Sequence, residues 1–330
     1  MRLLVTGGAG YVGSVVAAQL LAAGHQVTVL DDLSTGYRDA VPPGAEFVRG
    51  TIRDQAASVL AGRGIEAVLH FAASSLVGES VANPAKYWAN NLGGTLALLN
   101  AMRLAGTPRI IFSSTAAVYG EPERTPLEET SPTRPTSPYG ASKLAVDTAL
   151  TELARQHGFG AVSLRYFNVA GAERTGDGGW LRERHSPETH LIPNVLAAAA
   201  DGRGTRLFGD DYPTPDGTCI RDYIHVTDLA DAHLRALGAC GPGRHRIYNL
   251  GNGTGFSVRE VIGVCREVTG REIPVAVGPR RPGDPAILIA SARRIQADLG
   301  WQARRGLHAM VTDAWQARQA QFTHGREQAR

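Results

Sequence analysis

The chain has 330 residues, of which 43% are hydrophobic and 20% charged, with a formal net charge of +3. This balance is typical of a soluble globular protein and excludes a chain that is disordered or collagen-like throughout. The small net charge, with Lys and Arg scattered along the chain, gives no support for nucleic-acid binding. At this length we expect one large domain and a smaller one.

The N-terminal residues do not form a secretory signal, because the short apolar stretch after Met1 and Arg2 ends at once in glycines. No apolar run is long enough for a membrane-spanning helix. The cysteines are odd in number and lack metal-binding spacing; they are Cys219, Cys240 and Cys265. We therefore expect a cytoplasmic protein with reduced thiols, no metal site and no membrane partner.

Short β-branched runs alternate with helical patterns in the first half of the chain. We expect strands at residues 3–6, 26–30, 67–71, 109–113 and 161–165, and helices at 11–23 and 138–157. These strands are apolar on both faces, as buried parallel strands must be. The alternation predicts an α/β fold with a Rossmann-type, doubly wound parallel sheet.

The pattern changes after about Phe167. Gly and charged residues crowd positions 172–185, which predicts an exposed loop or insertion. We expect helices at 191–200, 291–299 and 307–318 among short strands, and a polar, frayed end at 319–330. We divide the chain into residues 1–167 and a smaller α/β domain at 168–330, with a segment around 219–250 returning to the first domain.

Three glycines follow the first predicted strand and open the first helix: Gly7, Gly10 and Gly13. Glycine permits a tight turn, close backbone approach to a pyrophosphate, and close packing of helix on strand. The helix N-terminus then offers free N–H groups to phosphates. Asp31 ends the second strand, where a carboxylate can bind ribose hydroxyls and favours NAD over NADP. The alternative is a left-handed turn that binds no ligand.

Tyr139 and Lys143 lie four residues apart in the helix predicted at 138–157, and therefore on one face. A free tyrosine has a pKa near 10, too high for a base at neutral pH. We expect the neighbouring ammonium to lower this pKa, as would the positive nicotinamide ring of an oxidised cofactor. The alternative is an unrelated tyrosine and lysine on the helix surface.

A run of hydroxyl side chains ends the strand at 109–113: Ser113, Ser114 and Thr115. Ligands lie at the carboxyl ends of strands in such sheets, so a hydroxyl there can reach a substrate hydroxyl and relay a proton. The alternative is that these side chains only satisfy backbone groups of the turn, which we expect for Ser114.

Together these features resemble the extended short-chain dehydrogenase/reductase superfamily, and within it the UDP-glucose (UDP-galactose) 4-epimerase family. The resemblance spans nearly the whole chain, and its later blocks are specific to the family. The similar blocks are VTGGAGYVGS at 5–14, VGES at 77–80, RYFN at 165–168, FGDDYPT at 208–214, RDYIHV at 221–226 and RRPGD at 280–284.

The resemblance implies reversible 4-epimerisation of UDP-galactose and UDP-glucose through a transient 4-keto sugar, with NAD that stays bound to the enzyme. Tyr139 would remove the proton of the sugar 4-hydroxyl, with Thr115 hydrogen-bonded to the same oxygen. A 4-epimerase of UDP-glucuronate or of a UDP-N-acetylhexosamine remains an alternative. A 4,6-dehydratase would carry an acid pair after Thr115, where two alanines stand. A non-catalytic NAD-sensing protein would have lost Tyr139 or Lys143.

The resemblance also implies which residues bind each ligand, with residues 168–330 forming the nucleotide-sugar domain. Beside the catalytic Tyr139, Lys143 and Thr115, the cofactor residues are Gly7, Gly10, Tyr11, Val12, Asp31, Asp32, Leu33, Thr51, Ile52, Phe71, Ala72, Ser75, Asn90, Ser113, Tyr139, Lys143 and Phe167. The substrate residues are Thr115, Asn168, His190, Leu191, Phe208, Arg221, Tyr223, Arg281, Asp284 and Leu288.

Some of these positions carry a specific expectation. Arg221 and Arg281 would bind the diphosphate, since forked guanidinium donors suit phosphate oxygens; an ion pair of Arg221 with Asp222 is the alternative. Three positions depart from residues found in the family: Thr115 stands where the family often has Ser, Thr51 stands where it usually has an Asp near the adenine, and Ser75 stands where some members have a Lys. Leu288 lies where side-chain size influences access for N-acetylated sugars, and Leu is of intermediate size. We also expect a homodimer through the helices around 84–105 and 139–157.

Overall fold

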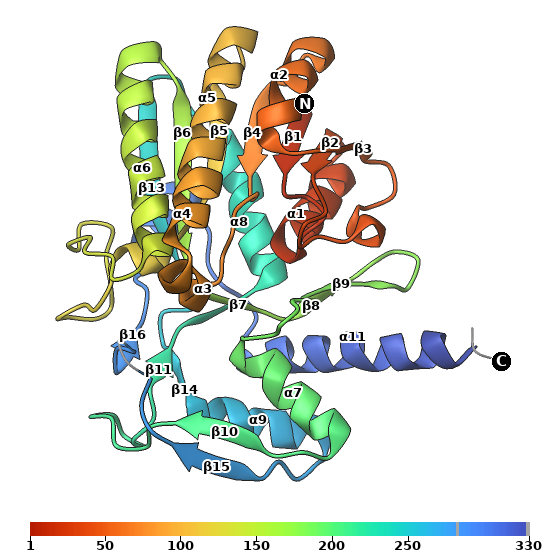
Figure 1. Ribbon diagram of the computed structural model, residues 1–330, viewed down its shortest axis with the longest axis vertical. Coiled ribbons are helices and arrows are strands. Elements are labelled where there is room, and N and C mark those ends of the chain that lie inside the picture. Colours follow the sequence, from red (N-terminus) through yellow and green to blue (C-terminus); the bar gives the residue numbers. More distant parts are fainter. Residues whose placement is uncertain (282–283, 328–330) are drawn as a thin grey trace.

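The computed structural model describes residues 1–281 and 284–327 of the chain. A seven-stranded sheet forms its larger part, in the order β13-β6-β5-β4-β1-β2-β3 with every neighbouring pair parallel (Figure 1). The predicted doubly wound parallel sheet is therefore confirmed. Its strands are β1 (Arg2–Thr6), β2 (Gln26–Asp31), β3 (Glu46–Arg49), β4 (Ala67–His70), β5 (Arg109–Thr115), β6 (Gly160–Tyr166) and β13 (Arg244–Leu250).

Helices cover both faces of this sheet, which explains why its strands are apolar throughout. Leu3 and Val5 of β1 belong to one core layer, and Leu4 between them belongs to the layer on the opposite face. The first layer packs against α1 (Tyr11–Ala22), α8 (Val226–Ala239) and α10 (Arg293–Leu299). The second packs against α2 (Ile52–Arg63), α5 (Gly94–Ala105) and α6 (Pro138–His157).

Local sequence fixes the start and end of α6, the helix that carries the predicted catalytic pair. The side chain of Ser137 accepts a hydrogen bond from the Gly140 N–H, and Pro138 occupies the first turn. Gly158 ends the helix with a left-handed φ of 68°. Short helical segments complete this part of the molecule: η1 (Arg38–Ala40), α3 (Val77–Ala82), α4 (Pro84–Tyr87), η2 (Trp88–Gly93) and η3 (Ala116–Val118).

A smaller lobe lies beyond the carboxyl ends of the strands (Figure 1). Its apolar core joins three helices: α7 (Leu191–Asp201), α9 (Val258–Thr269) and α11 (Leu307–Glu327). Short strands form small sheets beside them, namely β10 (Thr205–Phe208) with β15 (Val275–Gly278), β11 (Ile220–Arg221) with β14 (Phe256–Ser257) and β16 (Ile287–Leu288), and β7 (Asn168–Ala170) with β12 (Tyr223–His225).

Two expectations about the second half of the chain are wrong. The stretch 172–185, predicted as an exposed loop or insertion, is not a loop throughout, because it contains an antiparallel hairpin of β8 (Ala172–Arg174) and β9 (Trp180–Arg182). Leu181 of this hairpin is buried in the same apolar core layer as residues of α1 and α8. The stretch 319–330 was predicted to fray, but residues 319–327 continue α11. Residues 328–330 lie outside the described residues. Among the described residues, no helix is long and apolar enough to cross a membrane.

Candidate active site

A cavity of about 980 Å³ opens at the carboxyl ends of the sheet strands and unites most of the predicted site. The predicted residues that line it are Gly7, Gly10, Tyr11, Val12, Asp31, Asp32, Thr51, Ile52, Phe71, Ala72, Ser75, Asn90, Ser113, Thr115, Tyr139, Lys143, Phe167, Asn168 and His190. Further lining residues that sequence reasoning did not single out include Ser74, Tyr166, Glu183 and His185.

The glycine turn forms one wall of the cavity, and its backbone leaves no room for side chains at two positions. A Cβ at Gly7, where φ is 75°, would lie 2.5 Å from the Ala72 nitrogen. A Cβ at Gly13 would lie 2.2 Å from the Gly7 carbonyl oxygen. Gly10 is the N-cap residue of α1, so the first turn of that helix, with its free N–H groups, lines the cavity. This arrangement fits the pyrophosphate of a dinucleotide.

Asp31 stands at the end of β2, where its carboxylate is held by backbone amides. One oxygen accepts the Ala9 N–H at 3.0 Å and the other accepts the Leu33 N–H at 2.8 Å. Burial raises the pKa of Asp31 above its usual range, although these two hydrogen bonds oppose the shift. Leu33 adopts a left-handed φ of 62° and supports Asp31 without lining the cavity.

Lys143 is buried in the wall of the cavity, and its ammonium donates a hydrogen bond to the Ser113 carbonyl oxygen at 2.8 Å. The same ammonium lies 4.8 Å from the centre of the Phe112 ring. Burial lowers the pKa of Lys143 to about 8, and nearby Asp147 partly opposes this shift. Burial therefore disfavours the charged form of Lys143, whose ammonium lies beside the end of β5.

Tyr139 occupies the cavity one helical turn before Lys143, within hydrogen-bonding reach of Thr115. The expectation that Lys143 lowers its pKa is wrong for the protein alone. Burial raises the pKa of Tyr139, and only the hydrogen bond with Thr115 lowers it. The Lys143 ammonium instead donates its hydrogen bond to the Ser113 carbonyl oxygen. A base at Tyr139 therefore needs additional positive charge in the cavity.

Hydroxyl groups continue along the end of β5, as the sequence predicted. Thr115 accepts the Ala117 N–H at 3.1 Å and so also caps the short helix η3. The Ser113 hydroxyl forms a short hydrogen bond with Tyr166, which ends the neighbouring strand β6. Tyr166 belongs to the RYFN block, but the sequence analysis did not name it as a site residue. Its position at the end of a strand beside Ser113 could have identified it. Ser114 instead lies 3.3 Å from Asp147, away from the cavity.

A second group of predicted residues lies in the smaller lobe, outside the cavity lining. Arg221 pairs with Asp284 at 3.1 Å, and the Arg281 guanidinium lies 4.0 Å from the centre of the Phe208 ring. Leu288 pairs with Arg221 across the β11–β16 ladder. The other two members are Leu191, the first residue of α7, and Tyr223, which is buried in the core of the lobe. Residues 282–283 of the matched block lie outside the described residues.

The alternative of an ion pair between Arg221 and Asp222 is not what the structure shows. The Asp222 carboxylate accepts backbone N–H groups from Asn252, Gly253 and Ala290, at 2.8, 3.1 and 3.0 Å. Asp222 is a structural residue that fixes the loop after β13. Arg221 keeps its guanidinium for Asp284 and for the Ile220 carbonyl oxygen.

His190 lies at the entrance to α7 with its imidazole against two carboxylates. The Nδ1 atom is 2.7 Å from Glu188 and 3.0 Å from Glu183. Burial lowers the pKa of His190, but the hydrogen bonds with Glu183 and Glu188 outweigh it and raise the pKa to about 10. His190 is therefore held as a cation at the cavity wall, and Glu183 and Glu188 balance its charge.

The parallel sheet, the glycine turn at its first strand and the Tyr139–Lys143 pair at its carboxyl edge together define a dinucleotide-binding protein of the extended short-chain dehydrogenase/reductase type. The NAD dependent epimerase/dehydratase family matches residues 3–251. The chain belongs to this family.

Individual proteins agree with this assignment. The chain is 59% identical to the UDP-glucose 4-epimerase of Streptomyces lividans, over 96% of this chain and 95% of that protein. A crystal structure of a UDP-glucose 4-epimerase superposes with a TM-score of 0.92 at 46% identity, covering 97% and 98% of the two chains. The UDP-glucose 4-epimerase of Bifidobacterium longum in complex with NAD+ and UDP superposes with a TM-score of 0.90 at 37% identity, covering 97% and 98%.

Proposed function

We propose that this enzyme interconverts UDP-galactose and UDP-glucose by inverting the configuration at C4, with a molecule of NAD that it retains through each turnover. One observation carries the proposal: a single cavity contains the glycine turn, Tyr139, Thr115 and Lys143. Binding of a dinucleotide and removal of hydrogen from a substrate hydroxyl need residues of these kinds in one site.

The residues around the glycine turn fit NAD. The close backbone approach at Gly7 and Gly13 admits a pyrophosphate, and the Asp31 carboxylate at the end of β2 suits ribose hydroxyls. When bound, NAD accepts a hydride from C4 of the sugar and returns it to the opposite face of the 4-keto sugar. The Thr51 side chain caps α2 through the Asp54 N–H while it lines the cavity. The Thr51 hydroxyl therefore has a structural role in capping α2, and we propose that it also contributes to adenine binding.

Tyr139 is the residue that transfers the proton in this proposal. Its phenolate takes the proton from the sugar 4-hydroxyl, and Thr115 hydrogen-bonds to the same oxygen. Lys143 supplies a fixed positive charge from below, and its bond to the Ser113 carbonyl holds α6 against β5. Because Tyr139 lines the cavity, the proton it takes can return to the sugar oxygen.

The diphosphate of the substrate would bind between the lobes. We assign it to Arg221 and Arg281 in the smaller lobe, with His190 on the cavity side. Arg221 is bound to Asp284 and Arg281 is stacked on Phe208, so both guanidinium groups are pre-oriented. Asn168, Leu191, Tyr223 and Leu288 complete the substrate contacts. Residues 1–167 would bind NAD and 168–330 the nucleotide sugar, with α8 and β13 supporting the return of residues around 219–250 to the first domain.

The functional unit would be a homodimer in the cytoplasm. Five apolar side chains are exposed on α3, η2 and α5, next to α6: Val77, Val81, Trp88, Leu96 and Leu104. Their exposure ranges from 41% for Trp88 to 71% for Leu104. These exposed apolar side chains support an interface, and we propose a second copy of this chain as the partner.

The direct test is to supply the purified protein with UDP-galactose and no added NAD, and to quantify UDP-glucose. The account predicts conversion toward equilibrium from either sugar. The same assay with UDP-N-acetylglucosamine and UDP-glucuronate shows whether the enzyme also accepts N-acetylated or uronic acid sugars, which are the alternative substrates. Absence of any conversion, with saturating NAD also added, would refute the proposal.

A further inference from the structure

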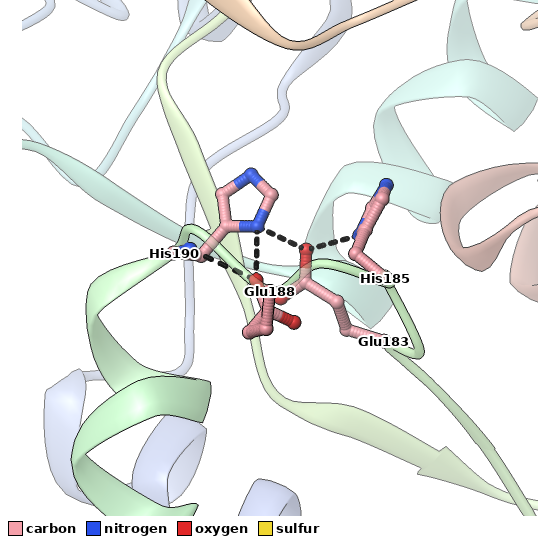
Figure 2. Close-up of side chains that lie close together, drawn as sticks. All are labelled: Glu183, His185, Glu188 and His190. Carbon is pink, nitrogen blue, oxygen red and sulfur yellow. Dashed lines mark hydrogen bonds and ion pairs between the residues drawn. The ribbon is translucent and has the colours of Figure 1, made fainter. Parts of the chain in front are cut away.

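Four side chains converge in the segment that joins β9 to α7: Glu183, His185, Glu188 and His190 (Figure 2). Each offers one nitrogen or oxygen atom, and these atoms lie within 4.8 Å of one another. Both imidazoles direct Nδ1 toward the same Glu183 oxygen, at 3.1 Å from His185 and 3.0 Å from His190. The His190 Nδ1 is also 2.7 Å from Glu188.

We propose that this cluster is a binding site for a divalent transition-metal ion, of which Zn²⁺ is the representative. Two imidazole nitrogens with two carboxylate oxygens are ligands that Zn²⁺ and its neighbours accept, whereas Mg²⁺ and Ca²⁺ prefer oxygen ligands alone. Tetrahedral zinc with bonds of about 2.0–2.2 Å places its ligand atoms roughly 3.3 Å apart. Three pairs of these atoms are at 2.7–3.1 Å and all four atoms lie within 4.8 Å of one another, so the side chains would rotate to bring every pair to this spacing.

The charges around the cluster favour a divalent ion. Binding of the ion would release the proton that His190 otherwise carries, because a coordinating imidazole nitrogen must be deprotonated. Both imidazoles are then neutral ligands, and the two carboxylates balance the charge of the 2+ ion. The nearest cation on the same segment, Arg184, is turned away, because it pairs with Asp39 and stacks on Tyr37 with 3.8 Å between guanidinium and ring centre. No compensating positive charge on this segment therefore competes for Glu183, apart from the two histidines themselves.

The surroundings also hold the ligands in place. The Glu183 side chain is only 9% exposed, and the Glu188 oxygen accepts the N–H groups of Thr189 and His190, both at 2.8 Å. Hydrogen bonds of this kind orient a carboxylate ligand before the ion arrives. The two imidazoles remain partly open, with side-chain exposures of 27% and 42%. An ion can therefore reach the site from solvent.

The position of the cluster connects it with the large cavity. Glu183, His185 and His190 line that cavity as well as the proposed metal site. A bound ion would fix the His190 ring on the carboxylates at the edge of this cavity. The existence of the metal site does not depend on the proposed activity.

The test is titration of the full-length, untagged, chelator-treated protein with Zn²⁺ by calorimetry, and with Co²⁺ by visible absorption. We expect one Zn²⁺ per chain and the strong visible bands of four-coordinate Co²⁺. His185→Gln and Glu188→Gln should each weaken binding at least roughly tenfold. His308→Gln is the matched control, because His308 lies 3.7 Å from Glu267 in an exposed pair on another helix.

Two results would overturn the proposal. One is unchanged Zn²⁺ affinity in both His185→Gln and Glu188→Gln, which would place the ion elsewhere. The other is absence of a stoichiometric binding event in the wild-type protein, which would leave the cluster as hydrogen-bonded histidines and carboxylates only. Circular dichroism of each variant confirms that the fold is intact, and His185, being partly exposed, offers the variant that least disturbs packing.

Discussion

Replacing Lys143 by Met should stabilise the protein while it abolishes turnover. Lys143 is 3% exposed, and burial lowers its pKa from 10.5 to about 8. At about 1.36 kcal/mol for each pH unit, keeping this side chain charged costs the fold about 3 kcal/mol at neutral pH. Met is uncharged and similar in length. It loses the hydrogen bond to the Ser113 carbonyl, worth about 1 kcal/mol, so the net gain at pH 7 is about 2 kcal/mol.

The pH dependence distinguishes this explanation from a simple packing effect. Between pH 8 and 10.5 the unfolded chain holds the lysine proton and the folded chain does not, so wild-type stability rises with pH in this window. The cost of the charge is full below pH 8 and is relieved as the pH rises toward 10.5. The two proteins should therefore be of nearly equal stability at pH 10.

Urea unfolding at pH 7 and pH 10, with matched nucleotide content, gives both free energies. The chain has only two lysines, so lysine-selective isotope labelling yields two side-chain signals whose titration can be followed by NMR. Lys86→Met assigns the second signal and serves as the control, because Lys86 is 46% exposed. A less stable Lys143→Met protein at pH 7, or a Lys143 titration near 10.5, would refute the reasoning.

Four further predictions follow from individual contacts. Tyr139→Phe should lower turnover by about 10²–10⁴-fold while UDP binding persists; near-normal turnover would remove Tyr139 from its role. Gly13→Ala places a Cβ 2.2 Å from the Gly7 carbonyl oxygen, so the purified protein should contain little nucleotide by absorbance, and full retention would contradict this. Arg281→Met should weaken UDP binding about 10–100-fold in calorimetry, and an unchanged Kd would exclude its contact with phosphate. Leu104→Glu should convert a dimer into a monomer by light scattering, and a persistent dimer would place the interface elsewhere.

The sheet and its glycine turn were predictable because their requirements are local. A strand buried on both faces must be apolar at successive positions, as Leu3, Leu4 and Val5 are, and a turn with a backbone atom 2.2 Å from a would-be Cβ must be glycine. The hairpin at 172–182 was missed because its strands are three residues each and largely polar. Its stability comes from contacts far away in sequence, such as Gln19 with Glu173 at 2.8 Å.

The candidate site was only partly predictable for a similar reason. Spacing identified Tyr139 and Lys143, but it could not reveal that Lys143 donates a hydrogen bond to Ser113 or that burial raises the pKa of Tyr139. The histidine–glutamate cluster was also missed, because the search for metal ligands considered cysteine spacing. Its members are close in sequence, yet only the folded segment before α7 turns Glu183 and His190 toward each other.

The central claim is that hydrogen removed from C4 returns to the same sugar within one closed site. The most direct measurement supplies UDP-galactose carrying deuterium at C4 to the purified enzyme without added NAD, and determines the label in UDP-glucose by mass spectrometry and NMR. The account predicts that the deuterium is retained at C4 of the product. Formation of UDP-glucose with protium from solvent at C4 would contradict it.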